Sequence, residues 1–290
     1  MNKAAESLQR CVFCDAELGK ANRSREHVIP EWLQEHLGIT DLTMQLKRYR
    51  PSTGEVLAIR NKHPMSRFVN GLVCRRCNNG WMASLEGFVK PILTELIDGQ
   101  RSPSSVTFEE GTQLARWLLK TACTSESGSN YRKVIPAEHY KAALDWQQQL
   151  PQGALAFLGQ ANLPSPYIEL SGCAWCCCPD LGDAIDKYIH LSYKYGFQLG
   201  NVMMVLAYWS PGTGLVTTFF TGTHCPIGYL GVGGLSVYET GSDSALRESV
   251  HIFSKAIGLG SDTCTTSKHF TDYETRFTRG RHDGSEEVRQ

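Results

Sequence analysis

The sequence predicts an α+β protein of two domains, an N-terminal domain organised by paired cysteines and a larger C-terminal domain of helices and strands. Three observations support this prediction. Two Cys-x-x-Cys pairs lie within the first 80 residues, where hydrophobic residues are few. Helix-like periodicity follows, and strand-like apolar runs begin at about Ala154. A chain of 290 residues can bury a substantial core.

The N-terminal domain, residues 1–98, is expected to contain short elements. Residues 31–37 are expected to form one or two helical turns, because Pro30 precedes them and Gly38 follows them. The runs 42–50 and 55–62 flank Pro-Ser-Thr-Gly, a turn sequence, so they are expected to pair as a hairpin.

A longer helix is expected from Asn78 to Ile97, because its apolar residues recur at helical spacing. Pro91 should kink or divide this helix, since proline lacks the N–H that the preceding turn needs. Residues 99–105 are polar and rich in helix breakers, which predicts a linker between the domains.

The C-terminal α+β domain is expected over residues 106–262. Helices are predicted at 111–126 and 136–149, the first with a buried face of Leu114, Trp117, Leu118 and Thr121. Two strands, 202–209 and 215–221, are separated by a turn sequence and are expected to pair. Cys173, Cys176, Cys177 and Cys178 are expected in a buried apolar strand rather than a second metal site, and residues 263–290 form a polar tail, frayed or ordered only by a partner.

Charge and composition set limits on function. The 29 basic and 29 acidic residues cancel, so the net charge indicates no nucleic-acid partner. Residues 1–90, however, hold fourteen Lys or Arg against nine Asp or Glu. The start of the chain has no apolar leader and no run of eighteen apolar residues occurs, so we expect a cytoplasmic protein with no membrane contact. In a reducing cytoplasm, paired cysteines more often bind metal than form disulfides.

The two pairs, Cys11/Cys14 and Cys74/Cys77, offer four thiolates, the ligand set of a closed tetrahedral zinc site. The 59 residues between the pairs are no obstacle, because the entropy of closing a loop rises slowly with its length. Such a Zn²⁺ is structural, since four sulfur ligands leave no open position for chemistry. The alternative is that these cysteines are buried only as small hydrophobic side chains.

Two motifs beside the cysteines carry a resemblance. Residues 26–30 read Glu-His-Val-Ile-Pro, and residues 71–80 read Gly-Leu-Val-Cys-Arg-Arg-Cys-Asn-Asn-Gly. This pattern resembles the HNH (His-Me finger) endonuclease family, particularly its four-cysteine phage members that resolve branched DNA. The resemblance covers residues 8–97 and implies a ββα-metal nuclease fold. Residues 78–82 and 115–122 are also similar to bacterial HNH proteins that carry a C-terminal extension.

The resemblance implies a role for each matching residue. His27 would be the general base that deprotonates a water, and Glu26 and Asn78 would hold a catalytic Mg²⁺ or Mn²⁺ through oxygen atoms. Asn70 is the candidate for the asparagine that orients the base. Glu26 stands where the family more often has aspartate, and the segment between Pro30 and Gly71 is longer than is usual.

Each residue also has a structural interpretation. Glu26 and His27 could form a surface ion pair, and Asn78 could cap a helix. Glu86 is expected to be a solvated helix residue rather than a third ligand. Basic residues near the motifs could follow a phosphate backbone or could be ordinary solvated positions; they are Arg23, Arg25, Lys47, Arg48, Arg50, Arg60, Lys62, Arg67, Arg75 and Arg76.

The functional expectation is therefore a metal-dependent HNH endonuclease that hydrolyses phosphodiester bonds in DNA with weak sequence preference, in the setting of host defence. RNA cleavage fits the same residues. The C-terminal domain would sense, target or dimerise, or bind a regulatory partner. The alternative from another class is a zinc-dependent nucleic-acid-binding module without catalysis, in which Glu26 and Asn78 are structural.

Overall fold

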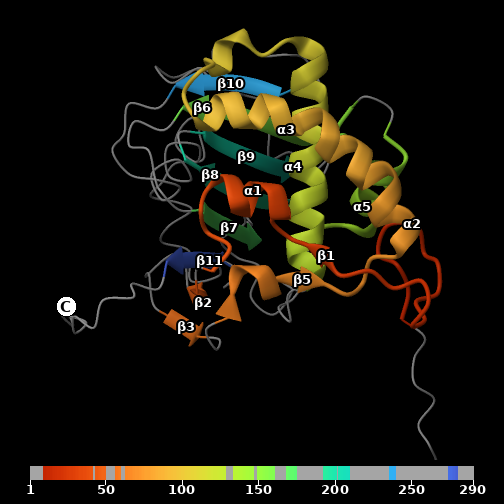
Figure 1. Ribbon diagram of the computed structural model, residues 1–290. Coiled ribbons are helices and arrows are strands. Elements are labelled where there is room, and N and C mark those ends of the chain that lie inside the picture. The colour runs from red at the N-terminus through yellow and green to blue at the C-terminus, as the bar shows by residue number, and fades with distance from the viewer. Residues whose placement is uncertain are drawn as a thin grey trace, which may run out of the picture.

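The protein is mixed helix and sheet, which confirms the α+β class (Figure 1). The computed structural model describes residues 9–41, 43–49, 56–59, 63–128, 133–146, 149–160, 168–174, 192–200, 202–209, 235–239 and 274–279. Its helices are α1 (Glu31–His36), η1 (Met65–Arg67), α2 (Arg75–Cys77), η2 (Asn78–Met82), α3 (Ala83–Ile97), η3 (Pro103–Ser105), α4 (Phe108–Gly128) and α5 (Ala137–Leu144). Its strands are β1 (Glu26–His27), β2 (Thr43–Tyr49), β3 (Val56–Ile59), β4 (His63–Pro64), β5 (Val69–Asn70), β6 (Ala154–Gln160), β7 (Ile168–Ala174), β8 (Ser192–Leu199), β9 (Val202–Trp209), β10 (Leu235–Glu239) and β11 (Glu274–Arg279).

Most of these strands belong to one sheet, in the order β10-β6-β9-β8-β7-β11-β2-β3, with β4 paired to the start of β2. Neighbouring strands are antiparallel except β10 and β6, which are parallel. The predicted hairpin is confirmed as β2–β3, and it joins this sheet through β11 (Figure 1). Strands from both predicted domains therefore form one sheet.

Helices α3 and α4 pack against each other and lie across one face of the sheet, where α4 contacts β6, β9 and β10 (Figure 1). The predicted inner face of α4 is confirmed, since Leu114, Trp117, Leu118 and Thr121 are all fully buried. One hydrophobic core extends from the cysteine pairs through α3 and α4 to β9. Helix α4 is thus the central helix of the described structure.

Two backbone positions differ from or refine the sequence prediction. Helix α3 continues through Pro91, and the irregular backbone lies instead at Gly80, at φ −97° and ψ −110°, where η2 precedes α3. Gly200, with φ +57°, makes the turn from β8 to β9, and a Cβ atom there would lie 2.9 Å from a methyl carbon of Ile97. Glycine at this turn therefore allows the β8–β9 hairpin to approach the end of α3.

Part of the predicted polar tail, residues 263–290, is a β-strand. Residues 274–279, which hold few aliphatic side chains, form β11, which pairs with β7 on one side and with β2 on the other. Cys173 lies in β7, as predicted for a strand. Cys176, Cys177 and Cys178, and the predicted strand 215–221, lie outside the described residues. Within the described part of the chain, no helix is both long enough and apolar enough to span a membrane.

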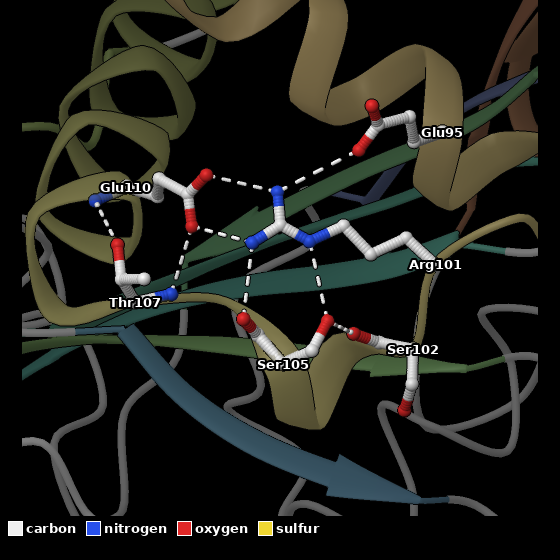
Figure 2. A network of polar contacts seen from close by, with 6 residues as sticks. All are labelled: Glu95, Arg101, Ser102, Ser105, Thr107 and Glu110. Atoms are coloured by element: carbon white, nitrogen blue, oxygen red, sulfur yellow. Dashed lines mark hydrogen bonds and ion pairs between the residues drawn. The ribbon is translucent and has the colours of Figure 1, made fainter.

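The segment predicted as a linker, residues 99–105, is a short turn fixed by Arg101 (Figure 2). The guanidinium donates to both carboxylate oxygens of Glu110, at 2.8 and 2.6 Å, and to Oγ and the carbonyl oxygen of Ser105, at 3.2 and 3.0 Å. Glu95, near the end of α3, lies 3.7 Å from the same guanidinium. Arg101 therefore joins the end of α3 to the start of α4.

Thr107 and Glu110 form a capping box at the start of α4 (Figure 2). The Thr107 N–H donates to the Glu110 carboxylate at 2.8 Å, and the Glu110 N–H donates to Oγ1 of Thr107 at 3.3 Å. The hydrogen bonds from Arg101, followed by those from Thr107, lower the pKa of Glu110 to about 2. The charged form of this carboxylate is thus the one that the fold stabilises.

Glu110→Gln should therefore destabilise the protein in a pH-dependent way. At pH 7 we expect a loss of roughly 1–3 kcal/mol in the free energy of unfolding, because two charge-assisted hydrogen bonds are weakened. The folded-state pKa of Glu110 lies below its ordinary value of 4.5, so its contribution is present above that value and is lost as the pH falls toward 2. Denaturant unfolding at several pH values should show the difference from the native protein shrink over that range. Glu109→Gln, at an exposed neighbouring position, is the control, and an equal effect of both substitutions would contradict the assignment.

Candidate functional site

The four predicted cysteine ligands meet in one cluster. The sulfur atoms of Cys11, Cys14, Cys74 and Cys77 all lie within 4.8 Å of one another. Cys11 Sγ is 3.9 Å from Cys77 Sγ, and Cys14 Sγ is 3.6 Å from Cys74 Sγ. Zinc–sulfur bonds of about 2.3 Å in a regular tetrahedron require sulfur–sulfur distances of about 3.8 Å. None of the four forms a disulfide, so the cluster could hold a zinc ion.

Local backbone structure shapes this cluster. The first pair lies on a tight turn in which the Asp15 N–H donates to the Cys11 carbonyl at 2.9 Å. Cys74 is the N-cap of α2, and its sulfur accepts from the Cys77 N–H at 3.4 Å. The Cys74 N–H in turn donates to the Cys11 sulfur at 3.4 Å. Backbone N–H groups aimed at sulfur favour thiolates, which are the form that binds metal.

Contacts and burial shift the pKa values of Cys11, Cys14 and Cys77. A hydrogen bond from Cys77 is the main cause that lowers the pKa of Cys11 to about 4, whereas the same contact raises the pKa of Cys77. Burial raises the pKa of Cys14. Without a cation the contact between Cys11 and Cys77 therefore favours one thiolate beside one protonated thiol, and a divalent cation would favour the thiolate form of its ligands.

A short two-stranded ladder, β1–β5, lies next to the cysteine cluster. Its register pairs Glu26 with Asn70 and His27 with Val69. The ladder is tied to the second cysteine pair by the contact of Arg23 with Cys74 and by two hydrogen bonds from Ser24, its N–H at 2.9 Å and its hydroxyl at 2.8 Å, to the Val73 carbonyl. Three of the residues predicted for the active site therefore lie in one ladder.

Glu26 points into the protein, where its carboxylate meets Lys120 of α4. Lys120 Nζ lies 2.7 Å from Glu26 Oε1 and 2.6 Å from Glu86 Oε1. Lys120 is fully buried and Glu26 is 5% exposed, so the alternative of a surface ion pair between Glu26 and His27 is wrong. The expectation that Glu86 is a solvated helix residue is also wrong, because its carboxylate is half-buried and ion-paired.

His27 contacts different groups from Glu26. Its Nε2 lies 3.2 Å from the carbonyl oxygen of Ser66, and its Nδ1 lies 3.5 Å from the exposed Glu31 carboxylate. A carbonyl oxygen can only accept, so Nε2 carries the hydrogen in this contact and the neutral ring keeps a lone pair on Nδ1. The imidazole is partly exposed, at 22% of its side-chain surface. A water or substrate could therefore reach Nδ1.

The side-chain hydrogen bonds of Asn70 go to α4 and to Leu72, and none of them goes to His27. It is fully buried, and its Nδ2 donates to the Thr124 carbonyl at 2.9 Å and to the Ser127 hydroxyl at 2.6 Å. Its Oδ1 accepts from the Leu72 N–H at 2.7 Å. The side chain thus fixes the ladder to α4 and does not contact the imidazole.

Asn78 begins η2, immediately after the cysteine cluster. Its helical backbone angles, φ −61° and ψ −58°, and the position of Cys74 as the cap of α2 show that Asn78 is not an N-cap. Its side chain is half-buried and makes no hydrogen bond to another described residue. The amide oxygen is thus available to a ligand.

Several basic side chains surround these residues at the surface. Arg25 precedes Glu26 and is exposed, Arg67 follows Ser66 and is exposed, and Arg75 and Arg76 are exposed on α2. Arg25, Arg67 and Arg76 form no ion pair within the described part of the chain. Exposed arginines thus stand next in sequence to Glu26, to Ser66, which contacts His27, and to the cysteine pair before Asn78, and such side chains suit contact with a phosphate backbone.

Sequence reasoning missed Lys120. One signal was present, since Lys120 stands among Trp117, Leu118, Leu119 and Ala122 in a helix, and a lysine inside an apolar run needs a buried acidic partner. The partner, 94 residues earlier in the chain, could not be identified from spacing.

Comparison of the chain with protein-family models, with curated proteins and with solved structures gave no match. The geometry of the chain's own residues therefore carries the functional argument.

The cysteine cluster leads to a prediction of metal content. We expect the purified protein to hold one zinc ion per chain, and Cys77→Ser to lose it and to lower the melting temperature, because the ion closes a long loop. Elemental analysis and thermal unfolding would measure both effects. Cys123→Ser is the control, since Cys123 is a buried cysteine of α4 outside the cluster. Zinc retained by Cys77→Ser at the native level would contradict the assignment.

The hydrogen bonds of Asn70 predict that its replacement by alanine destabilises the protein, whereas the same replacement at Asn79 does not. Asn70→Ala should reduce the free energy of unfolding by roughly 2–4 kcal/mol, because it leaves the part-buried Leu72 N–H and the buried Thr124 carbonyl without this partner. Asn79→Ala, at an exposed position on η2, should change it by less than about 0.5 kcal/mol. Denaturant unfolding of the two variants tests the contrast, and similar values would show that Asn70 does not anchor the ladder.

Proposed function

We propose that the protein is a metal-dependent HNH endonuclease that hydrolyses phosphodiester bonds in DNA. The observation that carries the proposal is the order of elements around the cysteine cluster. Strand β1 with Glu26 and His27 pairs with β5, and the cluster then leads directly into the helical segment that begins at Asn78. This order agrees with the strand-strand-helix unit that the sequence resemblance implies.

His27 is suited to act as the general base. The Ser66 carbonyl holds the ring through Nε2, which leaves the lone pair on Nδ1, the nitrogen beside the exposed carboxylate of Glu31. A neutral imidazole with this orientation can take a proton from a water molecule that attacks the phosphorus atom. Glu31, at 3.5 Å from Nδ1, would stabilise the imidazolium that forms.

Glu26 and Asn78 would hold a divalent ion. Glu26 uses Oε1 for Lys120, and its second oxygen makes no hydrogen bond within the described residues; Asn78 has a free amide oxygen. Carboxylate and amide oxygens are the ligands that Mg²⁺ and Mn²⁺ prefer. Such an ion, when bound, neutralises charge that develops on the phosphate and the leaving oxygen.

The exposed arginines supply the rest of a nuclease surface. Arg25, Arg67, Arg75 and Arg76 belong to the segments that carry the base and the proposed metal ligands. Contacts of this kind bind phosphates without reading bases, so we propose weak sequence preference and a binding affinity that falls with salt.

The proposal predicts metal-dependent cleavage that requires His27. Supercoiled plasmid should be nicked or linearised with Mg²⁺ or Mn²⁺ and left intact with a chelator too weak to remove the zinc. His27→Ala should lower the cleavage rate by roughly 10²- to 10⁴-fold, the usual contribution of a general base. His63→Ala, which removes an exposed histidine of β4, should cleave at the native rate.

Three other outcomes of the cleavage experiment would each lead to a different conclusion. Cleavage of single-stranded RNA but not of plasmid would make the protein an RNA-cleaving nuclease of the same type. Zinc-loaded protein that binds DNA but cuts neither substrate would favour a nucleic-acid-binding module. Equal cleavage by the native protein and His27→Ala would exclude His27 as the base.

A further inference from the structure

We propose that Lys120 is a positioning residue of the active site, which holds the carboxylates of Glu26 and Glu86 together at the divalent ion and sets the charge of that site. This inference rests on the proposed function, because it concerns the same metal ligand. It adds helix α4, which lies beyond residues 8–97, and it gives Glu86 a role in the site.

One stripe of α4 makes the contacts that carry the proposal. Lys120, Thr124 and Ser127 follow one another at spacings of four and three residues, which places them on one helix face. Lys120 bonds to Glu26, and Thr124 and Ser127 bond to Asn70. Glu26 and Asn70 are direct partners in the β1–β5 ladder, so one face of α4 holds both strands.

The ammonium also brings two acidic groups together. Glu26 Oε1 and Glu86 Oε1 lie 2.7 and 2.6 Å from the same nitrogen, so the two oxygens cannot be farther apart than these two distances combined. Glu86 belongs to α3 and Glu26 to β1, and among the described residues Lys120 is the group that connects them. Without a cation between them, two neighbouring carboxylates would repel each other.

Burial fixes Lys120 in this place. The residue is fully buried, whereas Glu26 and Glu86 have side-chain exposures of 7% and 22%. The ammonium thus approaches the carboxylates from the protein interior, and of the three side chains Glu86 is the most exposed to solvent. A conformation in which Lys120 left this position would leave the carboxylates of Glu26 and Glu86 partly buried without a counter-charge.

The charges of Glu26, Glu86 and Lys120 predict the direction in which substitutions change the affinity for a divalent ion. Two carboxylates and one ammonium leave one net negative charge, which favours a divalent ion. Glu86→Gln removes that net charge, and Lys120→Met doubles it. The two substitutions should therefore shift metal affinity in opposite directions, which a lysine with a merely structural role would not do.

The test uses full-length, zinc-loaded protein and Mn²⁺, with free Mn²⁺ measured by electron paramagnetic resonance. Glu86→Gln should raise the Mn²⁺ concentration for half-saturation by roughly tenfold, and Lys120→Met should lower it by a similar factor. In plasmid cleavage at saturating Mn²⁺, Lys120→Met should still be slower than the native protein by at least about tenfold, because Glu26 has lost its anchor. Glu109→Gln, at an exposed position of α4, and Lys141→Met, at an exposed position of α5, are the charge-matched controls.

Three results would overturn the inference. Half-saturation of both variants within twofold of the native value would make Lys120 a structural residue, and a shift of both in the same direction would exclude its control of site charge. Native protein that binds no Mn²⁺ beyond its zinc would remove the site itself. If Lys120→Met does not retain zinc and therefore has not folded, Glu86→Gln alone decides, since an unchanged affinity in that variant contradicts the proposal.

The same experiment separates this inference from the proposed function. Opposite shifts in Mn²⁺ affinity without any plasmid cleavage would support the role of Lys120 at a metal site and would contradict the nuclease. Cleavage that depends on His27, with unchanged Mn²⁺ affinity in both variants, would support the nuclease and contradict the role of Lys120.

Discussion

A ladder with two residues in each strand cannot maintain its own geometry, and the candidate site depends on what holds β1 and β5 in place. Isolated two-stranded hairpins are marginal in water even when they are longer. Here the cysteine cluster fixes one end of the ladder, since Ser24 bonds to Val73 directly before Cys74. The α4 stripe fixes its inner side through Glu26 and Asn70. The site therefore depends on the cysteine cluster, which could hold a zinc ion, and on the buried polar contacts of Glu26 and Asn70 with α4.

The features predictable from the sequence are those that depend on residues close together in the chain. The clustering of the two cysteine pairs, the pairing of β2 with β3, and the apolar face of α4 each follow from a local rule, and each was predicted. The contact of Lys120 with Glu26 and the insertion of β11 beside β2 are long-range pairings. Such pairings leave no periodicity in the sequence, so single-sequence reasoning could not find them. Pro91 shows another limit, since tertiary packing keeps a proline inside α3.

Burial of Lys120 has an electrostatic cost that the rest of the site must offset. Desolvation acts to lower the pKa of this lysine, but the charges of Glu26 and Glu86 outweigh it, and the resulting pKa lies above the ordinary value. The protein thus keeps a permanent positive charge beside its proposed metal ligand. A buried ion pair is weak evidence for stability, because apolar residues of similar volume often replace such pairs without loss. The contribution of Lys120 at this position is therefore its charge beside Glu26 and Glu86 rather than a gain in stability.

The sheet explains how such a site can belong to a larger chain. The hairpin β2–β3 lies between β1 and β5 in sequence, yet it joins the C-terminal sheet through β11. Helix α4 contacts that sheet on one side and the ladder on another. A displacement of α4 relative to the sheet would therefore move Lys120 and the partners of Asn70 together, and both ladder strands would respond. The network couples the candidate site to the C-terminal region, so a nuclease built in this way would require that region for the arrangement of its metal ligand.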